Sequence, residues 1–149
     1  MSKRILGIDF GAARTGLAIS DSLGLMAHGL GTVNTKCFKN LISVISGKIK
    51  EYSENNDEID LIVIGDPINV NGTAGPESET VHILAERIRT ELGICVELHD
   101  ERYTTISAHK ILNVSGTYGE KRKSVIDTLS AEIILQNYIN KNSDRKSLT

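Results

Sequence analysis

The spacing of hydrophobic residues in this 149-residue chain changes near residue 38 from that of strands to that of a helix, and this change limits the folds available to it. Before residue 38, three short strand-like stretches are separated by turns, at Ile5–Phe10, Leu17–Ser20 and Ala27–Val33. Short turns between strands favour an antiparallel meander. After that point, apolar residues recur at helical spacing from Phe38 to Tyr52. The chain is therefore expected to begin as a small antiparallel sheet and then to add helices.

The middle of the chain alternates between strand and helix. Leu61–Ile64 is a continuous apolar run, which is typical of a central strand covered on both faces. A helix is predicted after it from Pro76 to Leu92, because proline suits the first turn of a helix and Gly93 can close the last one. Ile94–Leu98 then predicts a further strand.

The last third of the chain is expected to be mainly helical. The pattern predicts a short helix over Thr105–Asn113, a flexible loop at Ser115–Glu120 and a final helix over Ser124–Asn140. Residues 142–149 are expected to form a flexible tail, which leaves residues 1–141 as one domain. Three antiparallel strands followed by two parallel ones predict an α/β fold with a mixed five-stranded sheet and helices on both faces, as in RNase H-like proteins.

The amino-acid composition limits the cellular compartment that is expected for such a domain. Hydrophobic residues make up 40% of the chain and charged residues 24%, as in ordinary globular domains. No apolar run approaches the length of a membrane-spanning helix, so a cytoplasmic protein without membrane contact is expected. Cys37 and Cys95 lack metal-ligand spacing and are expected to stay reduced.

Four acidic side chains are expected to meet at one edge of the predicted sheet. Asp9 closes the first strand, and Asp100 and Glu101 follow the fifth. Ligands of open α/β sheets bind beyond the carboxyl ends of the strands. Asp127 precedes a stripe of small and apolar residues on the last helix, and this stripe would turn it toward the sheet. The four acids are therefore candidates for one site.

Each of these acids also has a purely structural interpretation. Asp9 could cap its own turn, and the Asp100–Glu101 pair could form a salt bridge with Arg102. Ser124 and Asp127 match the capping box that starts many helices. Taken singly, each acid leaves both interpretations open, and the expected convergence of three elements favours the shared site.

Clustered carboxylates suit a particular chemistry. Oxygen ligands are preferred by hard cations such as Mg²⁺ or Mn²⁺. Two such ions, about 3.5–4 Å apart, can activate a water and stabilise the leaving oxygen when a phosphodiester bond is hydrolysed. The same acids are therefore predicted to bind metal and to be catalytic. The four histidines are scattered and offer no zinc-type spacing.

Two segments are candidate contacts for nucleic acid. The loop from Gly65 to Pro76 follows a central strand and opens a helix, where backbone N–H groups can hold phosphate. Its candidate contacts are Asn69, Asn71 and Gly72, and a stiff structural turn is the alternative.

The second segment is the basic run Lys121, Arg122 and Lys123, just before the helix predicted to carry Asp127. We expect it to bind a phosphate backbone, although the net charge of the chain is −2. The alternative is that the run is a solvated surface loop.

Four motifs, in this order, resemble the YqgF (RuvX) family, over about residues 4 to 140. They are Ile5-Leu6-Gly7-Ile8-Asp9-Phe10-Gly11 with Arg14 and Gly16, the glycine- and proline-bearing 65–76 loop, Asp100-Glu101-Arg102 with Thr104-Thr105, and the helix of Asp127. Members of this family are named Holliday-junction resolvases or pre-16S rRNA nucleases. The resemblance implies an RNase H-like nuclease with its acids at Asp9, Asp100, Glu101 and Asp127. It also implies basic motif positions at Arg14 and Arg102, which are expected to contact the phosphates of a nucleic acid.

The chain departs from the family pattern in its first turn and in the 65–76 loop, where Asn71-Gly72 also replaces the usual Asp-Gly. Ala12 and Ala13 replace a hydroxyl residue and a lysine in the first turn, so weaker phosphate binding is expected. Asp66 replaces a leucine at the end of a central strand, which makes it a further candidate ligand.

The resemblance leaves the substrate open between structured RNA and branched DNA. A junction resolvase needs a symmetric dimer for paired cuts, and the sequence has no obvious apolar dimer stripe. A monomer or weak homodimer that processes the 5′ end of pre-16S rRNA is therefore expected first. A Holliday-junction resolvase and a catalytically weak RNA-binding module are the alternatives. Actin-like ATPases share the core but enclose ATP between two such domains.

Overall fold

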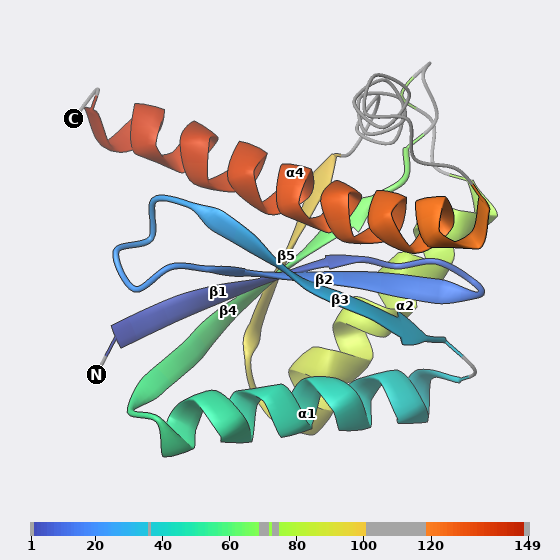
Figure 1. Cartoon of the computed structure of the whole chain (residues 1–149), viewed down its shortest axis with the longest axis horizontal. Helices are drawn as coiled ribbons and strands as arrows, with labels where there is room; N and C mark the ends of the chain where they lie inside the picture. The colour runs from blue at the N-terminus through green and yellow to red at the C-terminus, as the bar shows by residue number, and fades with distance from the viewer. Residues whose placement is uncertain (1, 36, 69–71, 73–74, 101–118, 148–149) are drawn as a thin grey trace.

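The computed structural model of the chain describes residues 2–35, 37–68, 72, 75–100 and 119–147 (Figure 1). Its elements follow the order strand, strand, strand, helix, strand, helix, strand, helix. They are β1 (Ser2–Asp9), β2 (Arg14–Ser20), β3 (Ala27–Asn34), α1 (Phe38–Glu54), β4 (Asp57–Asp66), α2 (Pro76–Leu92), β5 (Cys95–Asp100) and α4 (Gly119–Ser147).

The five strands form one mixed sheet in the order β3-β2-β1-β4-β5. β1 and β2 pair antiparallel, as do β2 and β3, whereas β4 lies parallel to β1 and β5 lies parallel to β4. The predicted fold class is confirmed. The strands run beyond the predicted stretches because their outer residues are polar, and polar residues give no hydrophobic signal.

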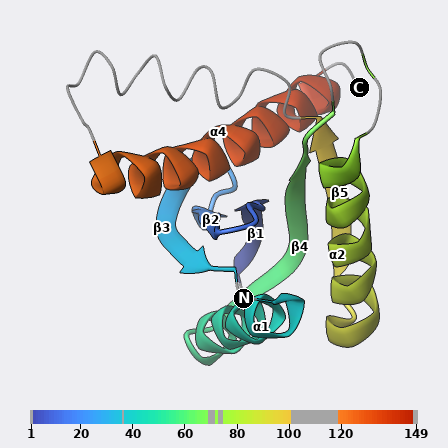
Figure 2. The same ribbon diagram turned by 90° about the vertical axis from the view of Figure 1, so that its right-hand side faces the viewer.

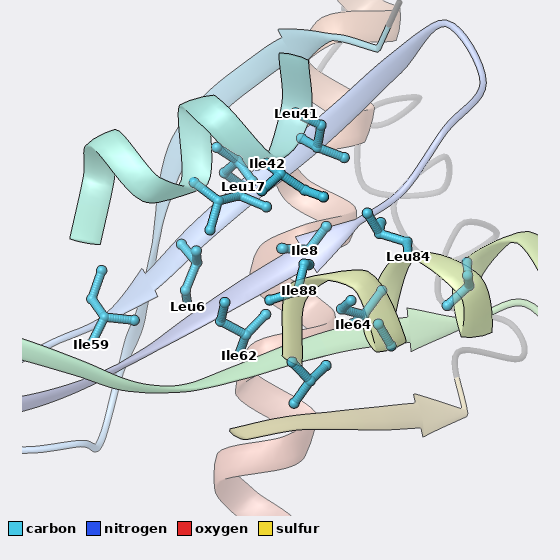
Figure 3. Packing of buried hydrophobic residues seen from close by; sticks show 14 of the residues in the cluster. Leu6, Ile8, Leu17, Leu41, Ile42, Ile59, Ile62, Ile64, Leu84 and Ile88 are labelled. Carbon is cyan, nitrogen blue, oxygen red and sulfur yellow. The ribbon is translucent and has the colours of Figure 1, made fainter. Parts of the chain in front are cut away.

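Helices cover both faces of the sheet (Figure 2). α1 and α2 pack on one face, where large aliphatic side chains fill the space between the layers (Figure 3). Ile8 of β1 and Ile64 of β4 are fully buried there, together with Leu41 of α1 and Leu84 of α2. α4 lies across the opposite face, over β1, β2 and β3. Strand alternation therefore sends even-numbered residues of β1 toward α1 and α2, and odd-numbered residues toward α4.

One boundary prediction is wrong. α4 begins at Gly119, so residues 121–123 lie within the helix and not in a loop before it. Glutamate, lysine and arginine are good helix formers, which explains how the helix extends past the predicted start. Ser124 is thus inside the helix, and the capping-box interpretation of Asp127 does not apply. α4 also continues to Ser147, within the segment expected as a tail.

The remaining expectations have mixed outcomes. The predicted helix over 105–113 lies outside the described residues. Cys37 and Cys95 are both free and both exposed. Within the described ranges, no helix carries an apolar stretch long enough to cross a lipid bilayer.

Candidate functional site

The site is built where α4 comes into direct contact with β2. Gly16 of β2 lies opposite Asp9 in the register of β1 and β2. A Cβ atom on Gly16 would sit 2.0 Å from the backbone carbonyl oxygen of Asp127, so any larger residue would force the strand or the helix to shift. The bare Cα of Gly16 therefore lets the Asp127 turn of α4 rest beside the strand pair that ends in Asp9.

The same close approach continues along α4. A Cβ on Gly7 of β1 would lie 2.9 Å from the Cβ of Leu135. Between these two contacts, Ala18 of β2 and Ala131 of α4 are fully buried in one small cluster. The predicted inward stripe of α4 is confirmed, since Ser130, Ala131 and Ile134 are all buried. Small residues thus set how deeply the helix sits on this face.

Asp9 and Asp127 line one cleft of about 430 Å³ at this edge of the sheet. The cleft lies between the end of β1, the first turns of α2 and the Asp127 turn of α4. Its other lining residues within the described ranges are Phe10, Gly11, Ala12, Pro67, Glu77, Thr80 and Val81. The structure therefore brings together two of the four predicted acids, and they come from opposite ends of the chain.

Arg14 forms an ion pair with Asp127. Its Nε atom donates to Oδ2 of Asp127 at 2.9 Å, and the two side chains are 27% and 25% exposed. Among the residues that the structure describes, Arg14 is the one hydrogen-bond donor to the Asp127 carboxylate. Arg14, which matches a basic motif position of the family that the sequence resembles, thus contacts a candidate metal ligand.

Asp66, the additional candidate ligand, is engaged on the other face of the sheet. It is 7% exposed, and its Oδ1 accepts a 2.6 Å hydrogen bond from Oγ of Ser78. Its Oδ2 lies 3.0 Å from Nε2 of His82. Ser78 belongs to the first turn of α2, whose N-cap residue Gly75 provides no side-chain hydrogen bond. Asp66 therefore joins the end of β4 to the positive end of α2.

Asp100 is exposed and is not among the described residues that line the cleft. In β5, Glu97 accepts a hydrogen bond from the Tyr138 hydroxyl of α4, and the His99 ring meets the Tyr138 ring edge-on at 6.4 Å. Val96 packs in the core on the opposite face. Asp100 continues the even-numbered series of Val96, so strand alternation directs it away from α4.

The comparisons with known proteins decide the family. The family model described as "RuvX: Holliday junction resolvase" matches residues 3–141. The chain belongs to the RuvX family. A relative from Ruminiclostridium cellulolyticum, named as a pre-16S rRNA nuclease, is 42% identical over 145 residues, covering 96% of this chain and 98% of its own. A second, from Syntrophus aciditrophicus, bears the same name and is 41% identical, covering 96% of this chain and 92% of its own.

Solved structures show the same fold at low sequence identity. Thermus thermophilus RuvC, solved with a Holliday junction substrate, superposes with a TM-score of 0.50 and 13% identity, covering 95% of this chain and 96% of its own. The Fowlpox virus resolvase, solved with Holliday junction DNA, gives a TM-score of 0.52 and 12% identity, covering 93% and 97%. The RuvX chain therefore has the RNase H-like fold that the sequence predicts.

The cleft of this RuvX chain has donors that fit a hard cation. Asp9 and Asp127 supply carboxylate oxygens, and Mg²⁺ is often held by one or two carboxylates while it keeps several waters. Within the ranges that the structure describes, no group of three or more His, Cys, Asp or Glu side chains is arranged to hold a metal ion by itself. The two acids fit a partly hydrated Mg²⁺ or Mn²⁺ better than a fully enclosed one.

The other predicted site residues lie partly outside the described ranges. Glu101, Arg102, Asn69 and Asn71 lie outside the described residues. Gly72 is exposed, with a φ of 87° that favours glycine. Residues 121–123 lie in the first turns of α4, ahead of Asp127 on the same helix.

Glu77 is a cleft residue that the sequence analysis does not identify. Its place in the first turn of α2 is explained equally well by the helix dipole, which favours an acid there. Only the tertiary structure, which brings the start of α2 and the Asp127 turn of α4 to one cleft, shows that this carboxylate shares the cleft with Asp9 and Asp127.

Proposed function

We propose that this chain is a metal-dependent nuclease that hydrolyses phosphodiester bonds and processes the 5′ end of pre-16S rRNA in the cytoplasm. The observation that carries the proposal is the shared cleft of Asp9 and Asp127, two acids that are 118 residues apart in sequence. Membership of the RuvX family and the names of its relatives support the choice of reaction.

The residues at the cleft would have separate roles in binding the metal and in balancing its charge. Asp9 and Asp127 would hold Mg²⁺ or Mn²⁺, with Glu101 as a third ligand. When bound, the metal would activate a water and neutralise charge that develops on the phosphate. Before it binds, Arg14 neutralises part of the repulsion between the two acids. Asp100, whose strand position directs it to the other face, is the weaker candidate of the Asp100–Glu101 pair.

The substrate backbone would enter along the start of α4. The basic residues 121–123 precede Asp127 by four to six positions, which corresponds to about 6–9 Å along a helix axis. A phosphate backbone held at the cleft would therefore pass close to them. Asn69, Asn71, Gly72 and Arg102 are proposed as further contacts.

A cleavage assay with three substrates tests this function. Single-stranded RNA, precursor 16S rRNA and four-way DNA junctions are incubated with Mg²⁺, with Mn²⁺ or with chelator, using the wild type and Asp9→Asn. We expect metal-dependent cutting of the precursor RNA by the wild type alone. Preferential cutting of the junction would favour the second candidate, a resolvase, which the family description "Holliday junction resolvase" supports. Full activity in folded Asp9→Asn protein would refute the mechanism.

A further inference from the structure

β2 provides no acid to the cleft, yet it contacts Asp127 in two independent ways. Gly16 leaves room for the backbone carbonyl of Asp127, and Arg14 binds its carboxylate. One contact sets where the helix turn lies, and the other sets how its side chain is oriented. Both residues belong to the same strand, two positions apart, so they lie on the same face of the sheet.

The hydrogen bond of Arg14 uses only one of the two carboxylate oxygens. Nε donates to Oδ2, and within the described part of the chain Oδ1 of Asp127 has no hydrogen-bond donor. A carboxylate in this state can keep its bond to the guanidinium and still offer the second oxygen to a cation. Hydrogen bonds to ligating carboxylates commonly act in this way, fixing the side chain and increasing metal affinity.

We propose that Arg14 is a positioning residue for the metal site: it holds Oδ2 of Asp127 so that Oδ1 is presented to the divalent cation. This inference rests on the proposed nuclease function, and it gives Arg14 a role other than the phosphate contact expected from the sequence. A charge-assisted bond of this kind is short and directional, and it restricts rotation of the carboxylate.

One effect opposes this role. The guanidinium is itself a cation, so it repels a metal ion bound to the same carboxylate. Both side chains are about a quarter exposed, and solvent and salt weaken the repulsion at such a site. The gain from a fixed ligand is therefore expected to exceed the loss from charge repulsion.

Binding of Mn²⁺, measured by calorimetry without substrate, tests the proposal. Arg14→Gln should weaken Mn²⁺ binding by roughly 10–100-fold, the usual effect of removing a partner of a metal ligand. Arg14→Lys should restore part of the affinity. Arg87→Gln is the matched control, because Arg87 makes an Nε–carboxylate bond of the same 2.9 Å length to Glu91 on α2, away from the cleft. Its Mn²⁺ affinity should equal that of the wild type.

Salt dependence of RNA binding separates positioning from phosphate contact. Single-stranded RNA is titrated in chelator, where it is not cut, at several salt concentrations. Loss of one phosphate contact reduces the log–log slope by about 0.7. Arg14→Gln should leave the slope unchanged, whereas replacing residues 121–123 by Gln serves as the positive control and should flatten it.

The other possible results of the Mn²⁺ and RNA titrations lead to different conclusions. Tighter Mn²⁺ binding by Arg14→Gln would show that Arg14 competes with the metal, and would overturn the inference. Unchanged Mn²⁺ affinity would also overturn it, and a flatter salt slope would then identify Arg14 as a phosphate contact. If the folded wild type bound no Mn²⁺, the proposed function would fall together with the inference. Wild-type binding with no loss in Arg14→Gln would refute the inference alone.

Discussion

The neighbouring strands β1 and β4 each end in an aspartate, and these two aspartates have different surroundings. β1 and β4 lie parallel, and Asp9 and Asp66 end them at the same edge. Asp66 is buried against α2, where Ser78 and His82 bind its two oxygens. Asp9 lines an open cleft with Asp127 of α4. An acid at a strand end is therefore not enough to indicate a metal site, because the surroundings that the neighbouring helices supply differ between the two strand ends.

The two faces of the sheet also differ in how closely the helices approach. On the face of α1 and α2, large aliphatic side chains such as Ile8, Ile64 and Leu84 separate helix from strand (Figure 3). On the face of α4, Gly7 and Gly16 bring the helix close to the strands. Fewer rotatable side chains then lie between the sheet and the candidate ligand, which suits a site that must hold its geometry.

The largest expected effect comes from replacing Asp127 in the cleft by asparagine, compared with the same replacement of buried Asp66. Asp127→Asn should lower metal-dependent cleavage by more than about 100-fold, because it removes a charged ligand. Loss of a residue that only hydrogen-bonds to a ligand already lowers metal affinity or activity by about 10–100-fold. Asp66→Asn should retain activity and lose about 1–3 kcal/mol of unfolding free energy through its buried hydrogen bonds. Cleavage rates at saturating Mg²⁺ and urea denaturation measure the two effects. A folded Asp66→Asn protein as inactive as Asp127→Asn would remove the distinction between the faces.

A smaller effect tests the close approach of α4. Gly16→Ala should lower the free energy of unfolding by about 1–3 kcal/mol, because the new methyl group would overlap the Asp127 carbonyl. Cleavage should fall as well, since the ligand turn must move. Gly47→Ala is the matched control, in an exposed part of α1 with no atom within 4 Å of the added methyl group. Its stability should rise by about 0.5–1 kcal/mol. Equal effects at both positions would show that α4 is not held by the glycine.

The smallest effect concerns His99, which lies on the α4 face of β5 beside Tyr138. Burial lowers the pKa of His99, nearby Lys141 lowers it further, and Asp100 opposes the shift. The folded state then binds a proton less readily than the unfolded state. Neutral His99 therefore contributes stability that is complete above the unfolded pKa of about 6.5 and is lost as the pH falls toward the lowered folded value.

Unfolding measured between pH 7.5 and 5 tests this contribution. His99→Gln should flatten the decline in stability over this range, whereas the same substitution at exposed His28 is the control. An identical pH profile for the wild type and His99→Gln would contradict the packing of this ring against α4.

Much of the fold could be predicted because its signals are local. The apolar run in β4 and the helical spacing of α1 and α2 are properties of short stretches, and they gave the sheet and its layers. The start of α4 was missed because a glycine followed by charged residues resembles a loop, although those charged residues favour helix. The local sequence does not distinguish a loop from the first turns of a helix at this position.

The site was predicted only in part, because its contacts are distant in sequence. Asp9 and Asp127 could be anticipated from a strand end and an inward helix stripe. The bond between Arg14 and Asp127 joins residues 113 positions apart, and no pattern encodes it. The role of Asp66 depends in the same way on donors supplied by α2. Glu77 had a sufficient local explanation, and only tertiary structure places it in the cleft.

The most direct test of a metal site on the α4 face is calorimetric titration of Mn²⁺ into the wild type, Asp9→Asn and Asp66→Asn. All three proteins are first shown to be folded. We predict that Asp9→Asn loses measurable binding, because it removes a charged oxygen ligand from the cleft. We predict that Asp66→Asn binds as tightly as the wild type, because its carboxylate is occupied by Ser78 and His82. Loss of binding in Asp66→Asn with full binding in Asp9→Asn would place the metal on the opposite face and contradict the account.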